Sequence, residues 1–417
     1  MKFKRTLIAA SLLAAGTVAN AAPSNEELWQ MMQDMQQKMQ DVQMQNQQLK
    51  AENADLKGKV EETEQAVEAV VVATEEAASS SLFSSGRTSI GGYGELHYNN
   101  LDDNNGDNDL DQLDFHRFVL FFSHEFTDDL RFWSEFELEH SVAGEGKEGE
   151  VELEQAYIEY DINDQNRVKG GVFLMPVGII NETHEPDTFY GVERNPIENK
   201  IIPSTWWEAG TMFSGDIANG FAYDLAVTSG LDVSKKGDKS TFKIRDGRQK
   251  VANAQANDLA YTGRLKWTAV PGVELSLTAQ YQEDITQGNI AESDDAVLIE
   301  THAVIQQGAF GLRALYAQWD LEGDAPKVAG YDEQTGWYIE PSYKINKNLG
   351  VFARYSAWDN QAGMSSIESE FEQFDLGVNW WIHKNVVLKL DYQFQDAESD
   401  TATEREGLNL GLGYQFY

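Results

Sequence analysis

The chain has 417 residues, of which 32 are basic and 69 acidic, so its net charge at pH 7 is −37. This balance argues against nucleic-acid binding, which requires a basic surface. Because the sequence contains no cysteine, it also excludes a disulfide framework and a thiolate metal site. The mean hydropathy is negative, which does not exclude a membrane β-barrel, because such barrels alternate apolar and polar residues.

The first 21 residues predict a secretory signal peptide. A basic start, MKFKR, precedes a short apolar core at residues 7–15, and the triplet ANA at 19–21 fits the small-x-small cleavage rule. Cleavage after Ala21 leaves 29 basic residues against 69 acids. Past this segment, no stretch approaches the roughly 20 continuous apolar residues of a membrane helix.

The segment 22–77 carries a heptad repeat. Two rows of mostly apolar residues, each seven apart and offset by four, run from Leu28 for almost seven heptads. Asn46 and Asn53 fall in one row, where buried amides fix register and oligomeric state. A lone amphipathic helix would leave this narrow seam exposed, so the pattern predicts an oligomeric coiled coil, which the Ser-rich linker 78–87 closes.

From residue 88 onward the period changes to two, as in LNLGLGYQF (408–416). Alternation of this kind is typical of strands with one apolar and one polar face. We expect sixteen such segments of about ten residues, the length of a tilted membrane strand. They lie near 88–98, 112–125, 129–140, 151–161, 166–176, 205–214, 219–229, 258–269, 272–283, 296–305, 309–319, 335–344, 348–358, 371–381, 385–396 and 405–417.

The connections between these segments alternate in length. Tight turns such as TDD, VPG and HKN alternate with long polar stretches such as 99–111, 177–204 and 230–257. Short turns on one rim and long loops on the other are typical of outer-membrane barrels. A soluble β-sandwich is the alternative, but it explains neither this alternation nor the aromatic residues near the strand ends. The pattern favours an all-β fold: a 16-stranded antiparallel transmembrane β-barrel over 88–417, preceded by an α-helical coiled coil.

Three stretches then resemble a known family. The terminal LGLGYQFY resembles the C-terminal signature of outer-membrane proteins, with Phe416 in phase and Tyr417 one residue beyond. GEVELEQAYIEYDI (149–162) and GVFLMPVGIINETHEP (171–186), with the stalk in front, resemble the phosphate-selective porin O and P family. The resemblance implies a homotrimer of 16-stranded barrels whose third loop folds inward and narrows the pore.

If the apolar phase of each strand faces lipid, the opposite phase lines a water-filled lumen. Rings of charged side chains in such a lumen set ion selectivity. The predicted lumen-wall residues include Arg131, Glu135, Glu137, Arg264, Lys266, Arg354 and Lys389.

The connection 177–204 is the candidate inward loop. Its charged residues Glu182, His184, Glu185, Asp187, Glu193 and Arg194 are the candidate constriction residues. Phosphate recognition favours several guanidinium groups, whereas this loop has Arg194 and Lys200 against five acids. The count favours a general or weakly cation-preferring pore over a phosphate channel.

The sequence lacks the motifs of the common metal-binding and catalytic sites. His184 and its neighbouring acids lack the HExxH spacing of a zinc site, and the acidic stretch 99–111 lacks the EF-hand spacing, although a looser calcium site stays open. There is no GxSxG elbow or P-loop. We therefore expect no enzyme activity, no cofactor and no metal.

The leading hypothesis is an outer-membrane porin of a Gram-negative bacterium that passes small hydrophilic solutes and ions. Its expected partners are outer-membrane lipid and two further copies of the chain. The alternatives are a phosphate- or anion-selective channel, and an envelope tether whose periplasmic coiled coil contacts the cell wall.

Overall fold

The computed structural model describes residues 87–104, 109–144, 149–234 and 241–417. Four further positions, Trp29, Gln33, Gln37 and Met44, are also described and are helical. The predicted signal peptide, the coiled coil at 22–77 and the linker at 78–87 otherwise lie almost wholly outside the described residues, so these three stay predictions.

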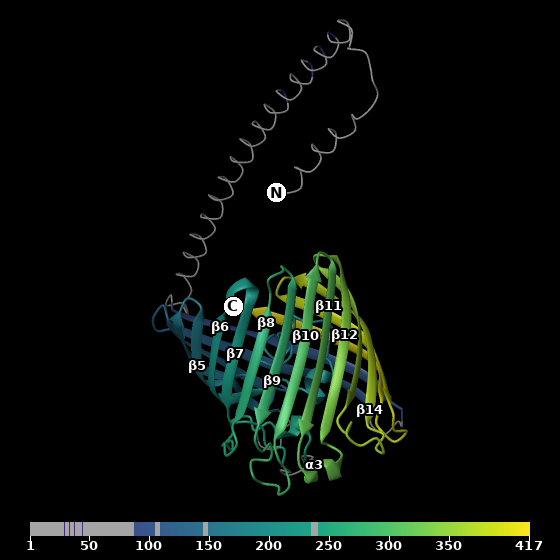
Figure 1. Cartoon of the computed structure of the whole chain (residues 1–417). Coiled ribbons are helices and arrows are strands. Elements are labelled where there is room, and N and C mark those ends of the chain that lie inside the picture. Colours follow the sequence, from purple (N-terminus) through teal and green to yellow (C-terminus); the bar gives the residue numbers. More distant parts are fainter. Residues whose placement is uncertain are drawn as a thin grey trace, which may run out of the picture. The chain divides into compact units, whose positions relative to one another are not determined.

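Sixteen strands of the described residues form one closed antiparallel barrel (Figure 1). Each predicted segment overlaps one of them, so this part of the fold prediction is confirmed. The strands are β1 (Thr88–Asp103), β2 (Leu110–Glu125), β3 (Leu130–Glu139), β4 (Val151–Asn163), β5 (Asn166–Leu174), β6 (Trp207–Asp216), β7 (Phe221–Thr228), β8 (Ala260–Trp267), β9 (Val273–Gln282), β10 (Ala296–Gln307), β11 (Phe310–Leu321), β12 (Glu333–Asn346), β13 (Leu349–Asp359), β14 (Glu370–His383), β15 (Val386–Ala397) and β16 (Arg405–Phe416).

The first and last strands close the barrel. β1 pairs antiparallel with β16 over twelve residue pairs, from Gly92 opposite Phe416 to Asp103 opposite Arg405. Every strand therefore has hydrogen-bonded neighbours on both sides. This matters in a bilayer, where an unpaired strand edge would leave backbone groups without partners.

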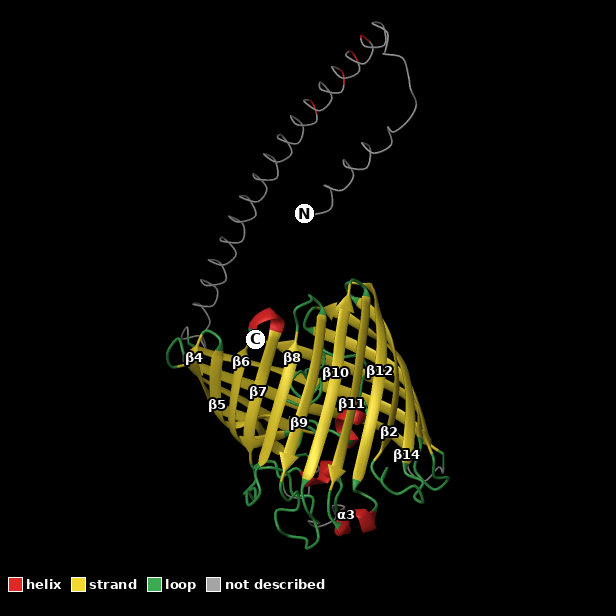
Figure 2. Ribbon diagram, viewed as in Figure 1, coloured by secondary structure: helices red, strands yellow, loops and turns green. Residues whose placement is uncertain are grey.

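The two rims differ as the sequence predicts (Figure 2). Short turns join β2 to β3 and each second pair after it, whereas longer segments join the remaining pairs at the opposite rim. Four short helical segments lie in the connections, namely α2 (Ile197–Lys200), η1 (Ala218–Gly220), η2 (Ile244–Gly247) and α3 (Asp324–Ala329). No helix among the described residues is both long and apolar enough to cross a membrane.

The barrel is apolar outside and polar inside. On β9, Leu275 and Leu277 are exposed on the outer surface, while Ser276 and Thr278 are buried toward the lumen. The same inversion runs through the other strands, since charged residues such as Arg354 are buried. An outward apolar band with a polar interior is the arrangement that lipid requires.

Two β-bulges reverse this alternation locally. Glu95 on β1 pairs with Arg117, but His97 pairs with Asp114, so β2 has one extra residue between these pairs. On β4 the extra residue is Glu154, because the register with β3 shifts between Glu135 and Phe136. An extra residue of this kind re-aims the side chains beside it. Consequently, both phases of β2 and β4 contribute side chains to the lumen.

The long connection between β5 and β6, residues 175–206, lies inside the barrel. Its apolar residues Val177, Ile197 and Ile202 are fully or almost fully buried, in one cluster with wall residues such as Leu298 and Tyr338. A surface loop would expose these side chains to water. We call this connection the lumen loop.

Candidate pore constriction

Hydrogen bonds tie the lumen loop at its base. The side-chain amide of Asn181 donates to the carbonyl oxygens of Met175 (2.8 Å) and Trp206 (2.9 Å), and its oxygen accepts from the Trp206 N–H (2.7 Å). Glu198, in α2, accepts from the backbone N–H groups of Ile179 and Ile180, both at 2.6 Å. These bonds satisfy polar groups that water cannot reach, so they fix the fold of the loop itself.

The tip of the loop crosses to β14 and β15. Asn379 donates to the Phe189 carbonyl oxygen (3.0 Å), and the Trp381 indole donates to the Asp187 carbonyl oxygen (3.2 Å). The Lys389 ammonium lies 3.5 Å from the centre of the Phe189 ring, a cation–π contact. The loop is thus held at its base and at its tip, and it spans the barrel interior.

Further contacts hold the loop against β15 and β16. Asp391 on β15 accepts from the Val192 N–H (2.6 Å). On β16, a Cβ added to Gly413 would lie 2.3 Å from the Cβ of Pro186. Glycine is therefore required there, because any side chain would push the loop away from the wall.

His184 joins the loop to β3 and β4. Its Nε2 lies 3.2 Å from Glu135 Oε1 and 3.6 Å from Glu154 Oε2, and all three side chains are almost completely buried. Burial lowers the pKa of His184, but the two carboxylates outweigh that effect and raise it to about 10. His184 is therefore a cation at neutral pH, enclosed by the wall.

Two further loop carboxylates bind cations or polar groups of the wall. Glu182 accepts a short hydrogen bond from Arg264 on β8. Glu193 Oε1 lies 3.0 Å from His97 Nδ1 and accepts from the Asn99 amide at 3.1 Å. Both acids are thus already compensated within the protein.

Glu185, Asp187 and Arg194 are the remaining candidates from the loop. Burial raises the pKa values of Glu185 and Asp187. Arg194 donates to the Thr205 hydroxyl at 2.9 Å, and no carboxylate of the described residues forms an ion pair with it. Among the charged loop candidates, Glu193 and Arg194 both line the two spaces of the lumen that lie nearest this part of the loop.

The predicted wall residues all face the lumen, mostly within ion pairs. Arg354 is buried between Asp375 (3.0 Å) and Glu340 (3.3 Å). Arg264 lies 2.7 Å from Asp224 besides its bond to Glu182. The others have these partners: Arg131 with Glu159 and Asp161, Lys266 with Glu274, Glu137 with Arg117, Glu135 with His184, and Lys389 with the Phe189 ring.

Sequence reasoning missed a second loop in the lumen, which lies between β7 and β8. Arg245 in η2 donates to the carbonyl oxygens of Asn199 (3.2 Å) and Ser204 (3.0 Å), and Arg248 donates to that of Thr205 (2.7 Å). Burial, followed by the neighbouring guanidinium groups, lowers the pKa of Arg245 to about 9, which leaves it charged at pH 7. The basic run KIRDGRQK (243–250) is the signal that could have drawn attention to this loop.

These groups enclose a space of about 230 Å³, which we call the inner cavity. The two loops contribute Arg194, Arg245, Arg248 and Lys250, together with the acid Glu193. The facing strands contribute Arg117 and the carboxylates of Glu95, Glu137, Glu139, Glu152 and Glu154. A solute in this cavity would meet opposite charges on opposite sides.

Two larger spaces flank the loops. The loop-side cavity, of about 700 Å³, is lined by Arg194, Lys200, Lys243 and Arg405 against the acids Asp114 and Glu193. The turn-side cavity, of about 470 Å³, is lined by Arg313, Lys344, Lys347 and Lys384 against Asp187. Cations therefore outnumber acids in both spaces, although the chain as a whole is strongly acidic.

The comparisons with known proteins agree with this architecture. A family model described as phosphate-selective porin O and P matches residues 90–417. A relative from Aquifex aeolicus, described as an uncharacterized protein, is 32% identical over 341 residues, which cover 74% of this chain and 76% of that protein.

Solved structures share the fold at low identity. An anion-selective porin from Comamonas acidovorans has a TM-score of 0.56 and 14% identity, covering 79% of this chain and 99% of that one. The trimer form of in-vitro folded OmpT, an outer membrane protein of Vibrio cholerae, has a TM-score of 0.51 and 9% identity, covering 79% and 98%. At such identities, the likeness establishes the barrel fold.

Proposed function

Because the chain belongs to the phosphate-selective porin O and P family and forms an outer-membrane channel, we propose that it passes small hydrophilic anions by passive diffusion. In this proposal the lumen loop, with residues 177–204, is the constriction, and Arg194 acts there together with Arg245 and Arg248. The fold and the family point to a channel rather than an enzyme and to a Gram-negative outer membrane.

One observation carries the anion preference. Arg194, Arg245 and Arg248 donate hydrogen bonds to neutral oxygens, namely a hydroxyl and three carbonyl groups. Within the described residues none of the three forms an ion pair, so no carboxylate neutralises them by direct contact beside the inner cavity. Such groups attract anions and repel cations in a narrow pore.

Three of the five facing carboxylates, in contrast, lie within 3.6 Å of cations of the protein. Glu95 lies 2.5 Å from Arg117, and Glu152 binds Lys250. Glu154 faces His184 at 3.6 Å. A carboxylate that is already paired contributes little further attraction for a mobile cation, since the positive charge of its partner cancels much of its electric field. The two flanking cavities, where cations outnumber acids, support the same preference.

This proposal differs from the weak cation preference that the loop composition favours. The composition counts Glu182, Glu193 and Glu198 as free charges, whereas each accepts hydrogen bonds within the barrel. The count also leaves out the second loop, which supplies Arg245 and Arg248. The charge that a solute meets thus depends on where the charged side chains lie and how they are paired, more than on how many there are.

Selectivity for phosphate among anions is a second candidate. The observation that favours it is the cluster of guanidinium groups at the inner cavity, because the planar guanidinium matches phosphate oxygens in a bidentate geometry. A phosphate-selective pore would show a lower chloride conductance after phosphate is added. A general anion pore would conduct both ions independently.

We also propose that three copies assemble, each with its own pore. The outer surface of the barrel is apolar, and OmpT of Vibrio cholerae, which shares the fold, is described in a trimer form. The lipid contacts of the barrel, and a tether from the coiled coil to the cell wall, are further proposals. Deleting residues 25–76 would impair envelope integrity without changing solute uptake if the tether exists.

The test is planar-bilayer recording of purified full-length protein. We expect stepwise openings in groups of three, and a reversal potential in a salt gradient that moves toward the cation direction when Arg245 and Arg248 are both replaced by Gln. Arg194→Glu should act in the same direction. Arg87→Gln is the matched control, because Arg87 is half exposed and lies 3.6 Å from Asp128 at the turn rim. An absence of conductance, or equal selectivity in all variants, would contradict the proposal.

A further inference from the structure

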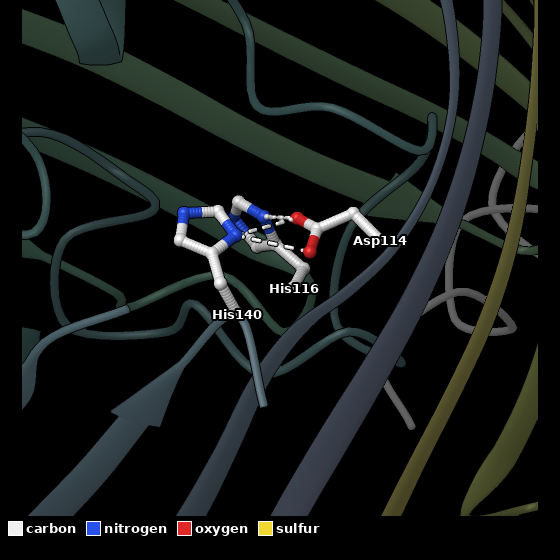
Figure 3. A group of neighbouring side chains, drawn as sticks. All are labelled: Asp114, His116 and His140. Carbon is white, nitrogen blue, oxygen red and sulfur yellow. Dashed lines mark hydrogen bonds and ion pairs between the residues drawn. The ribbon is translucent and has the colours of Figure 1, made fainter. Parts of the chain in front are cut away.

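Three side chains cluster at the loop-side end of the lumen. They are Asp114 and His116 on β2 and His140, directly after β3. Figure 3 shows both imidazole rings turned toward the Asp114 carboxylate. One ligand atom from each of the three lies within 4.8 Å of the others.

The backbone brings these residues together in two steps. The His140 N–H donates to the His116 carbonyl oxygen at 3.2 Å, so the two histidines are cross-strand neighbours. The bulge in β2 then places Asp114 and His116 on the lumen side, because it shifts the pairing from Arg117 opposite Glu95 to Asp114 opposite His97. Bulges that re-aim side chains in this way are common beside functional sites.

The distances fit a tetrahedral metal site. Asp114 Oδ2 lies 3.3 Å from His116 Nδ1 and 2.9 Å from His140 Nδ1. Two ligands bound to Zn²⁺ at about 2.0–2.1 Å in a tetrahedral arrangement are roughly 3.4 Å apart. The rings of His116 and His140 are nearly perpendicular, with centroids 5.8 Å apart. Small rotations of the side chains would therefore bring all three ligand atoms to one ion.

The site is also reachable from water. About two fifths of the His116 and His140 side chains is exposed, against 13% of Asp114. Both histidines line the inner cavity and the loop-side cavity. Three protein ligands with one position open to solvent is the arrangement of a zinc site that exchanges its fourth ligand.

The chemistry of the ligands selects the class of ion. Two imidazoles and one carboxylate suit Zn²⁺ and similar transition metals, whereas Ca²⁺ and Mg²⁺ prefer an all-oxygen shell. The neighbouring His97 stacks on His116 with ring centroids 4.6 Å apart, and its own nitrogens face Glu95 and Glu193. It therefore supports the His116 ring in place without competing for the ion.

We propose that Asp114, His116 and His140 bind a divalent transition-metal ion, of the Zn²⁺ class, at the loop-side entrance to the inner cavity. The bound ion adds positive charge to a passage that Arg194 also lines, and its open position accepts water or an anionic solute. Metal binding does not depend on the ion selectivity proposed above, so the two can fail separately.

The test is titration calorimetry of untagged full-length protein in detergent, with Zn²⁺ as the probe. We expect one ion per chain, and an affinity that falls at least about 100-fold in the double variant His116→Gln/His140→Gln, since even loss of a supporting hydrogen bond weakens metal sites 10–100-fold. His124→Gln is the control on the same strand, because His124 bonds the Thr88 hydroxyl at 2.7 Å outside the cluster. That variant should bind as the wild type does.

Two further measurements keep the test decisive. Asp114→Asn preserves the shape of the site while removing its charged ligand, so it should weaken binding even if the double variant folds poorly. Co²⁺ in place of Zn²⁺ should give the visible absorption of a tetrahedral site in the wild type and lose it in the variants. No saturable Zn²⁺ binding, or binding that is equal in the Asp114 and histidine variants and the wild type, would overturn the proposal.

Discussion

The attachment of the lumen loop through His184 leads to the most detailed prediction. His184→Gln removes the cation between Glu135 and Glu154 and leaves two buried carboxylates facing each other. Glutamine is close to histidine in volume and can still donate a hydrogen bond. The substitution therefore tests the charge and leaves the packing of the loop largely unchanged.

The expected magnitude follows from the titration of His184. Its pKa rises from 6.5 to about 10, and one pKa unit corresponds to 1.36 kcal/mol, so the charged form is favoured by ~5 kcal/mol. Removing one partner of a buried ion pair destabilises proteins by about 3–5 kcal/mol. The two figures agree. A free-energy change of 1.4 kcal/mol changes an equilibrium constant by a factor of ten. Local opening of the loop should become about two to three and a half orders of magnitude more frequent.

Hydrogen exchange measured by mass spectrometry reports this opening directly, because buried amides exchange only when their segment opens. Peptides that cover residues 177–196 should lose protection in His184→Gln, whereas strand peptides should not. His383→Gln is the control, since His383 lies in an exposed position at the turn rim. The second substitution Glu154→Gln, added to His184→Gln, should restore part of the protection. Unchanged exchange of the loop in His184→Gln would refute the reasoning.

Three further predictions concern pH, close packing and a buried charge. Because the folded pKa of His184 is raised, its stabilisation of the loop is complete below pH 6.5 and is lost as pH rises through about 10. Single-channel current fluctuations should therefore increase as pH approaches 10. Constant current noise from pH 7 to 11 would count against this prediction. Gly413→Ala should displace Pro186 and alter conductance, because its Cβ would lie 2.3 Å from that ring; Gly263→Ala, with its nearest neighbour at 3.6 Å, should not. Arg354→Met should lower barrel stability by about 3–5 kcal/mol, measured by urea unfolding, because it leaves Asp375 and Glu340 buried without their cation; an unfolding midpoint equal to that of the wild type would exclude this role.

The strands could be predicted from the sequence because each carries its own local signal. The alternation in β15 and β16 continues without interruption, and the short and long connections repeat in order. Closure between β1 and β16 follows from an even strand number once the fold is recognised. These features depend on residues that are neighbours in the chain.

The candidate site was harder to predict from the sequence, because it depends on residues that are not neighbours in the chain. A bulge shifts the phase of β2, so a strict period of two cannot assign both Asp114 and Arg117 to the lumen. Glu154 on β4 is hidden in the same way. His116 and His140 are far apart in the chain, and only strand pairing makes them neighbours. Periodicity carries no information about such register shifts.

Charge counting leaves out a different feature of the fold. The acids of the lumen loop are numerous, yet Glu182 and Glu193 are compensated by Arg264 and His97 on the wall. The cations that face the inner cavity come largely from another loop. The net charge of a segment therefore does not predict the field inside the pore, because pairing across the barrel is a property of the closed fold.

The reversal potential of the wild-type channel tests the central claim most directly. Purified full-length protein in a neutral planar bilayer, with a tenfold KCl gradient, separates the two ions by the sign of the zero-current voltage. The account predicts the sign of an anion-permeable pore, because Arg194, Arg245 and Arg248 face the inner cavity without an ion-paired carboxylate in the part of the chain that the structure describes. A reversal potential of the cation-selective sign would contradict it.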